Sequence, residues 1–223
     1  LATVEKSIHK TQKEARSGNK EAKKKLACLE QIKHLLDNAN WQQLRSLNDE
    51  LKQQCDELHL LTIKPILYVA NVAEDGFTNN PLLDKLQDYA NNEGSGIVAV
   101  CAAIESEIAE LEQQEQQEFL ETLNLSEPGL NRMIHAGYDL LSLETFFTAG
   151  PKEARAWTIC KNTSAPHAAG VIHTDFCKGF IRAEVIGFDD YIHCEGEQGA
   201  KTQGKWRLEG KDYIVHDGDV ILF

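Results

Sequence analysis

The stretch ILYVANVAEDG (residues 66–76) begins as a strand and ends as a polar loop. Residues 66–72 form a nearly continuous run of β-branched, aromatic and other apolar side chains, which is typical of a strand covered on both faces. Asn71 stands at the end of this run, and Glu74 follows three residues later. An amide and a carboxylate on one turn are the groups that a planar, hydrogen-bonding ligand needs. The stretch therefore predicts a strand that carries a ligand site at its carboxyl end.

A second strand is predicted downstream, at residues 97–103, after a helix that begins at Pro81. Another helix is expected over residues 105–119. Strands that alternate with helices favour an α/β arrangement, in which ligands bind outside the carboxyl ends of the strands. Asn71 and the tripeptide Cys101-Ala102-Ala103 both fall at such ends, so we expect them to line one crevice.

The residues before this region, 1–57, are predicted to be helical, with breaks at residues 17–19 and 38–40. Asn19 is the expected N-cap of the second helix. The third helix is expected to carry the four apolar residues Leu44, Leu47, Leu51 and Leu58. Short loops between helices favour an antiparallel helical hairpin.

The carboxyl-terminal third of the sequence changes to strand patterns after a helix predicted over residues 128–141. We expect one helix over residues 165–176, surrounded by strands at residues 153–160, 179–188 and 216–223 and by strand segments within 204–215. Strands around a single helix in so short a segment predict a small β-grasp, ubiquitin-like domain.

The composition excludes several classes of protein. A hydrophobic fraction of 42% and a charged fraction of 26% are those of a soluble globular protein. No run approaches the ~20 apolar residues of a membrane helix. The cysteines are spread without a Cys-x-x-Cys pair, which favours reduced thiols in a cytosolic protein; they are residues 28, 55, 101, 160, 177 and 194. The scattered His and Cys residues lack the spacing of a zinc site.

The net charge of −12 argues against a uniformly basic nucleic-acid binder, but it is unevenly distributed. Residues 1–25 hold eight Lys and Arg against three Glu, a net charge of +5. Lys20, Lys23 and Lys24 fall on about one turn of the second predicted helix, where most of their ammonium groups must point outward. Two interpretations stay open: a site for a polyanion, or an ordinary solvated helix face.

Longer stretches carry a family resemblance. They are NVAEDGF (71–77), VCAAIESEIAEL (100–111), EPGLNRMIHAGYDLLSLETFFTAGPKEARAWT (127–158), AAGVIHTDFCKGFIRAEVI (168–186) and GKWRLEGKDYIVHDGD (204–219). Through them, nearly the whole chain resembles the YchF/Ola-type ATPases, a branch of the Obg-related P-loop NTPases in the translation-factor group.

The resemblance implies an α/β multi-domain protein with three modules. Residues 1–62 resemble a helical, coiled-coil-like insertion, residues 63–138 the second half of the nucleotide-binding domain, and residues 139–223 a TGS domain of β-grasp fold. No G-x-x-x-x-G-K-[ST] motif occurs in the sequence. We therefore expect the phosphate-binding loop, the Mg²⁺ ligands and the catalytic residues to lie in an absent amino-terminal half, and both ends of the sequence to be cut.

The resemblance also suggests a role for the first stretch. Related GTPases have Asn-Lys-x-Asp here, and the Asp accepts hydrogen bonds from the ring N–H and the exocyclic amine of guanine. Val72 and Glu74 replace the Lys and the Asp, so the guanine clamp is not in place. Asn71 can still pair with adenine. The family implies that the main chain at Val72 reads the adenine amine, and that residues 101–103 stand where related GTPases place Ser-Ala-Lys beside the base.

The expected function is thus that of a cytoplasmic, Mg²⁺-dependent ATPase that binds ATP and the ribosome or its RNA. This portion alone is expected to be inactive, to hold no metal, to bind no membrane and to recognise no DNA sequence. One alternative is an RNA- or ribosome-binding interaction module without a nucleotide role. Another is a redox or metal sensor that uses the cysteines.

Overall fold

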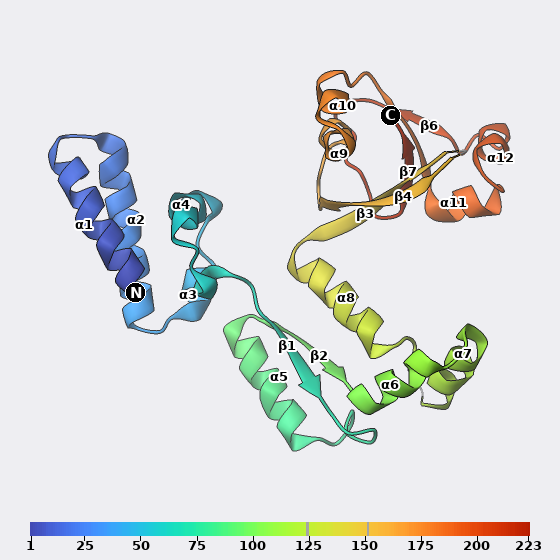
Figure 1. The fold of residues 1–223 in the computed structure, drawn as a ribbon, viewed down its shortest axis with the longest axis horizontal. Coiled ribbons are helices and arrows are strands. Elements are labelled where there is room, and N and C mark those ends of the chain that lie inside the picture. Colours follow the sequence, from blue (N-terminus) through green and yellow to red (C-terminus); the bar gives the residue numbers. More distant parts are fainter. Residues whose placement is uncertain (124, 151) are drawn as a thin grey trace. The chain divides into compact units, whose positions relative to one another are not determined.

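The computed structural model describes residues 1–123, 125–150 and 152–223 (Figure 1). It divides into two compact units, Leu1–Ala136 and Gly137–Phe223. Each unit has its own buried clusters of apolar side chains. Helices and sheets occur together, which confirms the predicted mixed α/β class.

The first unit opens with a pair of packed helices, α1 (Ala2–Arg16) and α2 (Lys20–Asp37). Asn19 caps α2 as predicted, since its Oδ1 accepts hydrogen bonds from the main-chain nitrogens of Glu21 and Ala22 at 2.9 and 3.3 Å. The two helices bury an apolar seam that includes Val4, Ile8, Leu29, Ile32 and Leu35.

The expected single third helix is wrong. The segment contains two short α-helices and two 3₁₀ turns: α3 (Trp41–Arg45), α4 (Asp49–Cys55), η1 (Asp56–Leu58) and η2 (Leu61–Ile63). The break arises because Asn48 starts a new helix, its Oδ1 accepting a hydrogen bond from the nitrogen of Leu51 at 2.9 Å.

The rest of the first unit alternates strands and helices. β1 (Leu67–Asn71) and β2 (Gly96–Val100) pair in parallel, with α5 (Pro81–Glu93) between them in sequence. Three helices follow: α6 (Ala102–Glu110), α7 (Gln113–Thr122) and α8 (Gly129–Leu140), whose last residues belong to the second unit. In the described residues this sheet has only these two strands, so Val69 is 45% exposed. The expectation that β1 is covered on both faces is not met in this structure.

Two predicted boundaries in this region are wrong. β2 ends at Val100 rather than at Ala103, because Cys101 is the N-cap residue of α6 and the two alanines are already helical. The single helix expected over 105–119 is two helices, because Glu112 and Glu115 form a capping box that starts α7.

The second unit is built on a five-stranded sheet with the order β4-β3-β7-β5-β6. Its strands are β3 (Leu143–Ala149), β4 (Ala154–Cys160), β5 (Ala183–Gly187), β6 (Arg207–Glu209) and β7 (Asp219–Leu222). β3 and β7 are parallel, and the other neighbours are antiparallel. The helices are α9 (Ala165–Ile172), α10 (Thr174–Lys178), α11 (Phe188–His193) and α12 (Glu197–Thr202).

Sequence patterns missed several elements here. β3 was not predicted, because Phe146 and Phe147 belong to two different core clusters and the strand therefore lacks a polar face. Helices α11 and α12 were not predicted either. The expected helix over 165–176 is two helices, because the side chain of His173 caps α10 through the nitrogen of Asp175. The strand expected over 179–188 is confined to β5.

Candidate functional site

The carboxyl ends of β1 and β2 lie side by side. Asn71 is opposite Val100 in the parallel register, and the nitrogen of Val72 donates a hydrogen bond to the carbonyl oxygen of Val100 at 2.8 Å. The pairing thus extends one residue past the end of β1. The predicted ligand-binding residues of the two strands are brought to one edge of the sheet, as expected for an α/β arrangement.

The side chain of Asn71 bridges the two strand ends. Its Oδ1 accepts a hydrogen bond from the main-chain nitrogen of Ala102 at 3.1 Å, at the start of α6. This contact orients the amide, because the oxygen faces the helix and the –NH₂ group is left without a hydrogen-bond partner among the described residues. Asn71 is exposed, so the free –NH₂ donors are available to a ligand.

The loop that follows Asn71 is held by local hydrogen bonds. The nitrogen of Gly76 donates to the carbonyl oxygen of Ala73 at 2.9 Å, which closes a tight turn. A Cβ atom at Gly76 would lie 3.1 Å from both the nitrogen and the oxygen of Ala73, so the turn favours glycine. The Nδ2 of Asn80 donates to the oxygen of Gly76 at 2.9 Å, while its Oδ1 caps α5.

These two supporting residues, Gly76 and Asn80, were not singled out from the sequence. The signal that could have identified Asn80 is its position directly before Pro81, a typical arrangement of an N-cap followed by a proline in the first turn.

The remaining predicted site residues differ in accessibility. Val72 is half-buried against an apolar cluster that contains Cys101 and Ile104, whereas Glu74 is exposed and has no hydrogen-bond or ion-pair partner in the described part of the chain. Cys101 is only 2% exposed, so its thiol lies in the core. Ala102 and Ala103 are exposed in the first turn of α6. The structure therefore offers a ligand the amide of Asn71, main-chain groups and the two alanines.

A second polar network lies at the amino-terminal side of the same strand. Glu93 accepts hydrogen bonds from the hydroxyls of Tyr89 and Tyr68 at 2.8 and 2.9 Å, and Arg45 lies 3.5 Å away. These hydrogen bonds, with the nearby Arg45 guanidinium, lower the pKa of Glu93. The hydrogen bond to Glu93 raises the pKa of Tyr68 to about 12. Arg45 also donates to the hydroxyl of Ser95 at 3.1 Å, so the network joins α3 to the β1–β2 region.

The basic residues predicted for a polyanion lie on the helical hairpin. Lys20, Lys23 and Lys24 are exposed in the first turns of α2, and none of them has an ion-pair partner among the described residues. Lys25 differs, because its ammonium group lies 3.1 Å from the carboxylate of Glu57. Three lysines without an ion pair in the described part of the chain therefore lie close together on one helix, and Lys24 shares a surface hollow with the four acids Glu14, Glu21, Glu50 and Glu57.

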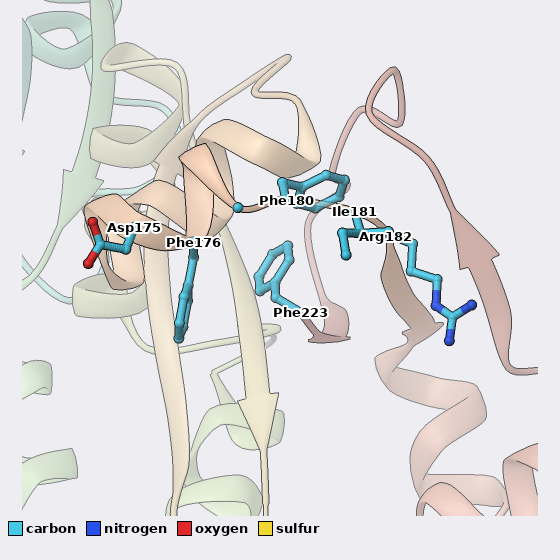
Figure 2. A pocket seen from close by; sticks show the side chains of 7 residues that line it. Asp175, Phe176, Phe180, Ile181, Arg182 and Phe223 are labelled. Carbon is cyan, nitrogen blue, oxygen red and sulfur yellow. The ribbon is translucent and has the colours of Figure 1, made fainter.

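The second unit contains a groove of about 570 Å³ (Figure 2). Its walls are mainly apolar, and Asp175 and Arg182 lie toward opposite ends; the other lining residues are Phe176, Gly179, Phe180, Ile181 and Phe223. The described residues that line this groove include no Ser, Cys or His and therefore no pair of nucleophile and base. In the ranges that the structure describes, no group of three or more His, Cys, Asp or Glu residues could hold a metal ion. None of the helices in those ranges has the length and apolar character that a membrane crossing requires.

Comparisons with known proteins give one consistent result. A family model named YchF-GTPase_C, described as a protein of unknown function, matches residues 143–223. The chain is 56% identical over its whole length to the ribosome-binding ATPase YchF of Haemophilus influenzae, of which it covers 61%. It is 46% identical to the protein of the same name from Bacillus subtilis, of which it covers 62%.

A solved structure agrees with these relatives. The structure of the YchF GTPase of Schizosaccharomyces pombe matches 99% of the chain with a TM-score of 0.83 and 31% identity. The chain covers 61% of that protein. The chain therefore spans less than two thirds of the length of the relatives that it matches.

Proposed function

We propose, because relatives named YchF match this chain along nearly its whole length, that it is the base-reading and partner-binding portion of an ATP-hydrolysing P-loop protein that associates with the ribosome. One relative is called an ATPase and another a GTPase, so their names leave the choice of purine open. The site at the end of β1 bears on that choice.

Adenine fits the groups that this site presents. The –NH₂ group of Asn71 can donate to N7 of a purine, while its Oδ1 already accepts a hydrogen bond from the nitrogen of Ala102. A main-chain carbonyl at Val72 would accept from the exocyclic amine of adenine. Guanine would instead need a carboxylate that accepts from its ring N–H and amine. The longer Glu74 stands where related GTPases have that Asp.

The observation that carries the proposal is the hydrogen bond between Ala102 and Asn71. It holds an amide donor at the edge of two parallel strands, where α/β proteins bind nucleotides. Residues 101–103 then lie beside the base, with the two exposed alanines facing it and the thiol of Cys101 directed into the core.

We further propose the three-module division of the chain: a helical insertion over residues 1–62, the second half of the nucleotide-binding domain over 63–138 and a TGS domain over 139–223. A central parallel pair, β3 and β7, flanked by antiparallel strands supports a β-grasp fold for the last module. The phosphate-binding loop and the Mg²⁺ ligands belong to the part of the relatives that this chain does not span. Bound Mg²⁺ would supply charge neutralisation at the phosphates.

Ribosome association is proposed from the names of the relatives and from the charges on α2. Lys20, Lys23 and Lys24 offer a compact positive patch to ribosomal RNA, although the whole chain is acidic. A protein with these partners would act in the cytoplasm.

ATP hydrolysis and ribosome co-sedimentation by the intact protein test this function. We expect the intact protein to hydrolyse ATP with Mg²⁺ and to sediment with ribosomes, and residues 1–223 alone to hydrolyse none. Ribosome binding by an intact protein that binds no nucleotide would instead favour an interaction module.

A further inference from the structure

Two charged side chains lie outside the predicted base site: Glu105 on α6 binds the first turn of α8, and Arg132 on α8 contacts Phe77 in the loop over residues 71–77. We propose that Glu105 and Arg132 are positioning residues, which hold this loop in the geometry that reads the purine. The proposal rests on the adenine-binding function proposed above and adds two residues to it that sequence patterns did not indicate.

Glu105 joins α6 to the first turn of α8. Its carboxylate accepts hydrogen bonds from the main-chain nitrogens of Gly129 and Leu130 at 2.7 and 3.1 Å. A carboxylate at this position satisfies main-chain donors that a helix start leaves unpaired, and it carries the charge that the helix dipole favours. The start of α8 is therefore fixed to α6 by the side chain of Glu105.

Gly129 allows the two helices to come this close. A Cβ atom at this position would lie 2.7 Å from Oε1 of Glu105 and 3.1 Å from a methyl group of Val100. Val100 is the residue paired with Asn71 at the end of the sheet. The first turn of α8 is thus seated against the strand end that carries the base site.

Arg132 reaches from α8 to the far end of the loop. Its guanidinium carbon lies 5.6 Å from the centre of the Phe77 ring, within the range of a cation–π contact. Its Nε and Nη2 atoms are buried and have no hydrogen-bond partner within the described residues. The Phe77 ring packs in the same apolar cluster as Val72 and Cys101. Arg132 is half-buried, and the contact of its guanidinium with Phe77 is the interaction that the structure shows for it.

These contacts link the loop over residues 71–77 to α6, α6 to α8, and α8 back to the loop. Asn71 holds the start of α6, Glu105 on α6 holds the start of α8, and Arg132 on α8 holds Phe77 at the end of the loop that begins at Asn71. Losing any one of these contacts removes one of the constraints on the conformation of the loop. Because recognition depends on sub-ångström placement of donors and acceptors, such a loss weakens base recognition more than phosphate binding.

Equilibrium affinities of the intact protein for ATP and UTP separate this role from a purely structural one. The two nucleotides share ribose and phosphates, and UTP lacks the purine ring. The test variants are Glu105→Gln and Arg132→Met. The matched controls are Glu107→Gln, an exposed acid on the same helix, and Arg16→Met, an exposed arginine at the end of α1.

We expect each test variant to bind ATP about tenfold more weakly, the effect of losing one charge-assisted contact. UTP affinity should stay within about twofold of the unchanged protein, as should both affinities of the controls. Arg132→Lys keeps a cation near Phe77 and should recover most of the ATP affinity. It also provides a second test of the position if Arg132→Met fails to fold.

The other outcomes would overturn the inference in distinguishable ways. If the unchanged protein prefers ATP over UTP and both test variants keep that affinity, the two residues do not position the loop and the proposed function stands. If ATP and UTP affinities fall in parallel, Glu105 and Arg132 support general folding instead. If the unchanged protein binds ATP and UTP equally, the proposed base site fails, and the positioning role fails with it.

Discussion

The main-chain nitrogen of Ala102 donates a hydrogen bond to Oδ1 of Asn71 at 3.1 Å and so joins the end of β1 to the start of α6. The amide oxygen accepts this hydrogen bond, and the exposed –NH₂ group has no hydrogen-bond partner among the described residues. We therefore propose two separable roles for Asn71: its oxygen holds the start of α6, and its nitrogen donates to the ligand.

Substitutions at Asn71 should distinguish these roles. Asn71→Asp keeps an acceptor for the nitrogen of Ala102 but lacks the donor for a purine N7. Asn71→Ala loses both groups. We expect both variants of the intact protein to bind ATP about tenfold or more weakly, with little change in thermal stability because the side chain is exposed. Titration calorimetry and thermal unfolding measure the two effects.

The relative severity of the two variants is informative. Asn71→Ala also frees the start of α6, whereas Asn71→Asp keeps that contact and turns an acceptor oxygen toward the acceptor N7 of the purine. ATP affinity that is unchanged in both variants would reduce Asn71 to an ordinary turn residue.

The basic patch on α2 gives a second prediction. Reversing Lys20, Lys23 and Lys24 to Glu should reduce ribosome co-sedimentation of the intact protein and flatten its dependence on salt concentration, because each phosphate contact releases condensed counterions. ATP binding should stay normal. The matched control is Lys25→Glu, since Lys25 is already paired with Glu57 at 3.1 Å.

If the triple variant co-sediments with ribosomes as well as the unchanged protein does, at both low and high salt, these lysines are only solvated. Ribosome contact would then have to come from the second unit.

The network around Glu93 gives a prediction about pH. Hydrogen bonds from Tyr89 and Tyr68 hold the pKa of Glu93 below its ordinary value of 4.5. A carboxyl group with a lowered pKa stabilises the folded state above its unfolded pKa, and this stabilisation is lost as the pH falls through the folded value. Glu93→Gln should therefore lower the unfolding temperature of residues 1–223 at pH 7, and the difference from the unchanged chain should shrink near pH 3.

The control for this experiment is Glu110→Gln, an exposed acid at the end of α6. If Glu93→Gln lowers the unfolding temperature by the same amount at pH 7 and near pH 3, the ionisation of Glu93 contributes nothing to stability.

The sequence was sufficient to predict the features that depend on local chemistry. The apolar run before Asn71 predicted β1, Asn19 predicted the start of α2, and Pro81 predicted the start of α5. The juxtaposition of Asn71 with residues 101–103 also followed from the rule that parallel strands end at one edge.

Features that depend on distant contacts were not predictable in this way. β3 was missed because Phe146 and Phe147 are both covered, so the strand shows no alternation of polar and apolar residues. The contacts of Glu105 with Gly129 and of Arg132 with Phe77 join residues far apart in sequence. Glu105 by itself was indistinguishable from any acid in the first turn of a helix.

The most direct test of the central claim, that the end of β1 reads adenine, is competition for labelled ATP bound to the intact protein. We predict that unlabelled ATP displaces the label at far lower concentration than GTP does. The double variant Val72→Lys, Glu74→Asp should improve GTP affinity by about 1–3 kcal/mol, the worth of a good bidentate base contact. Displacement of labelled ATP by GTP as effectively as by ATP itself would contradict the claim.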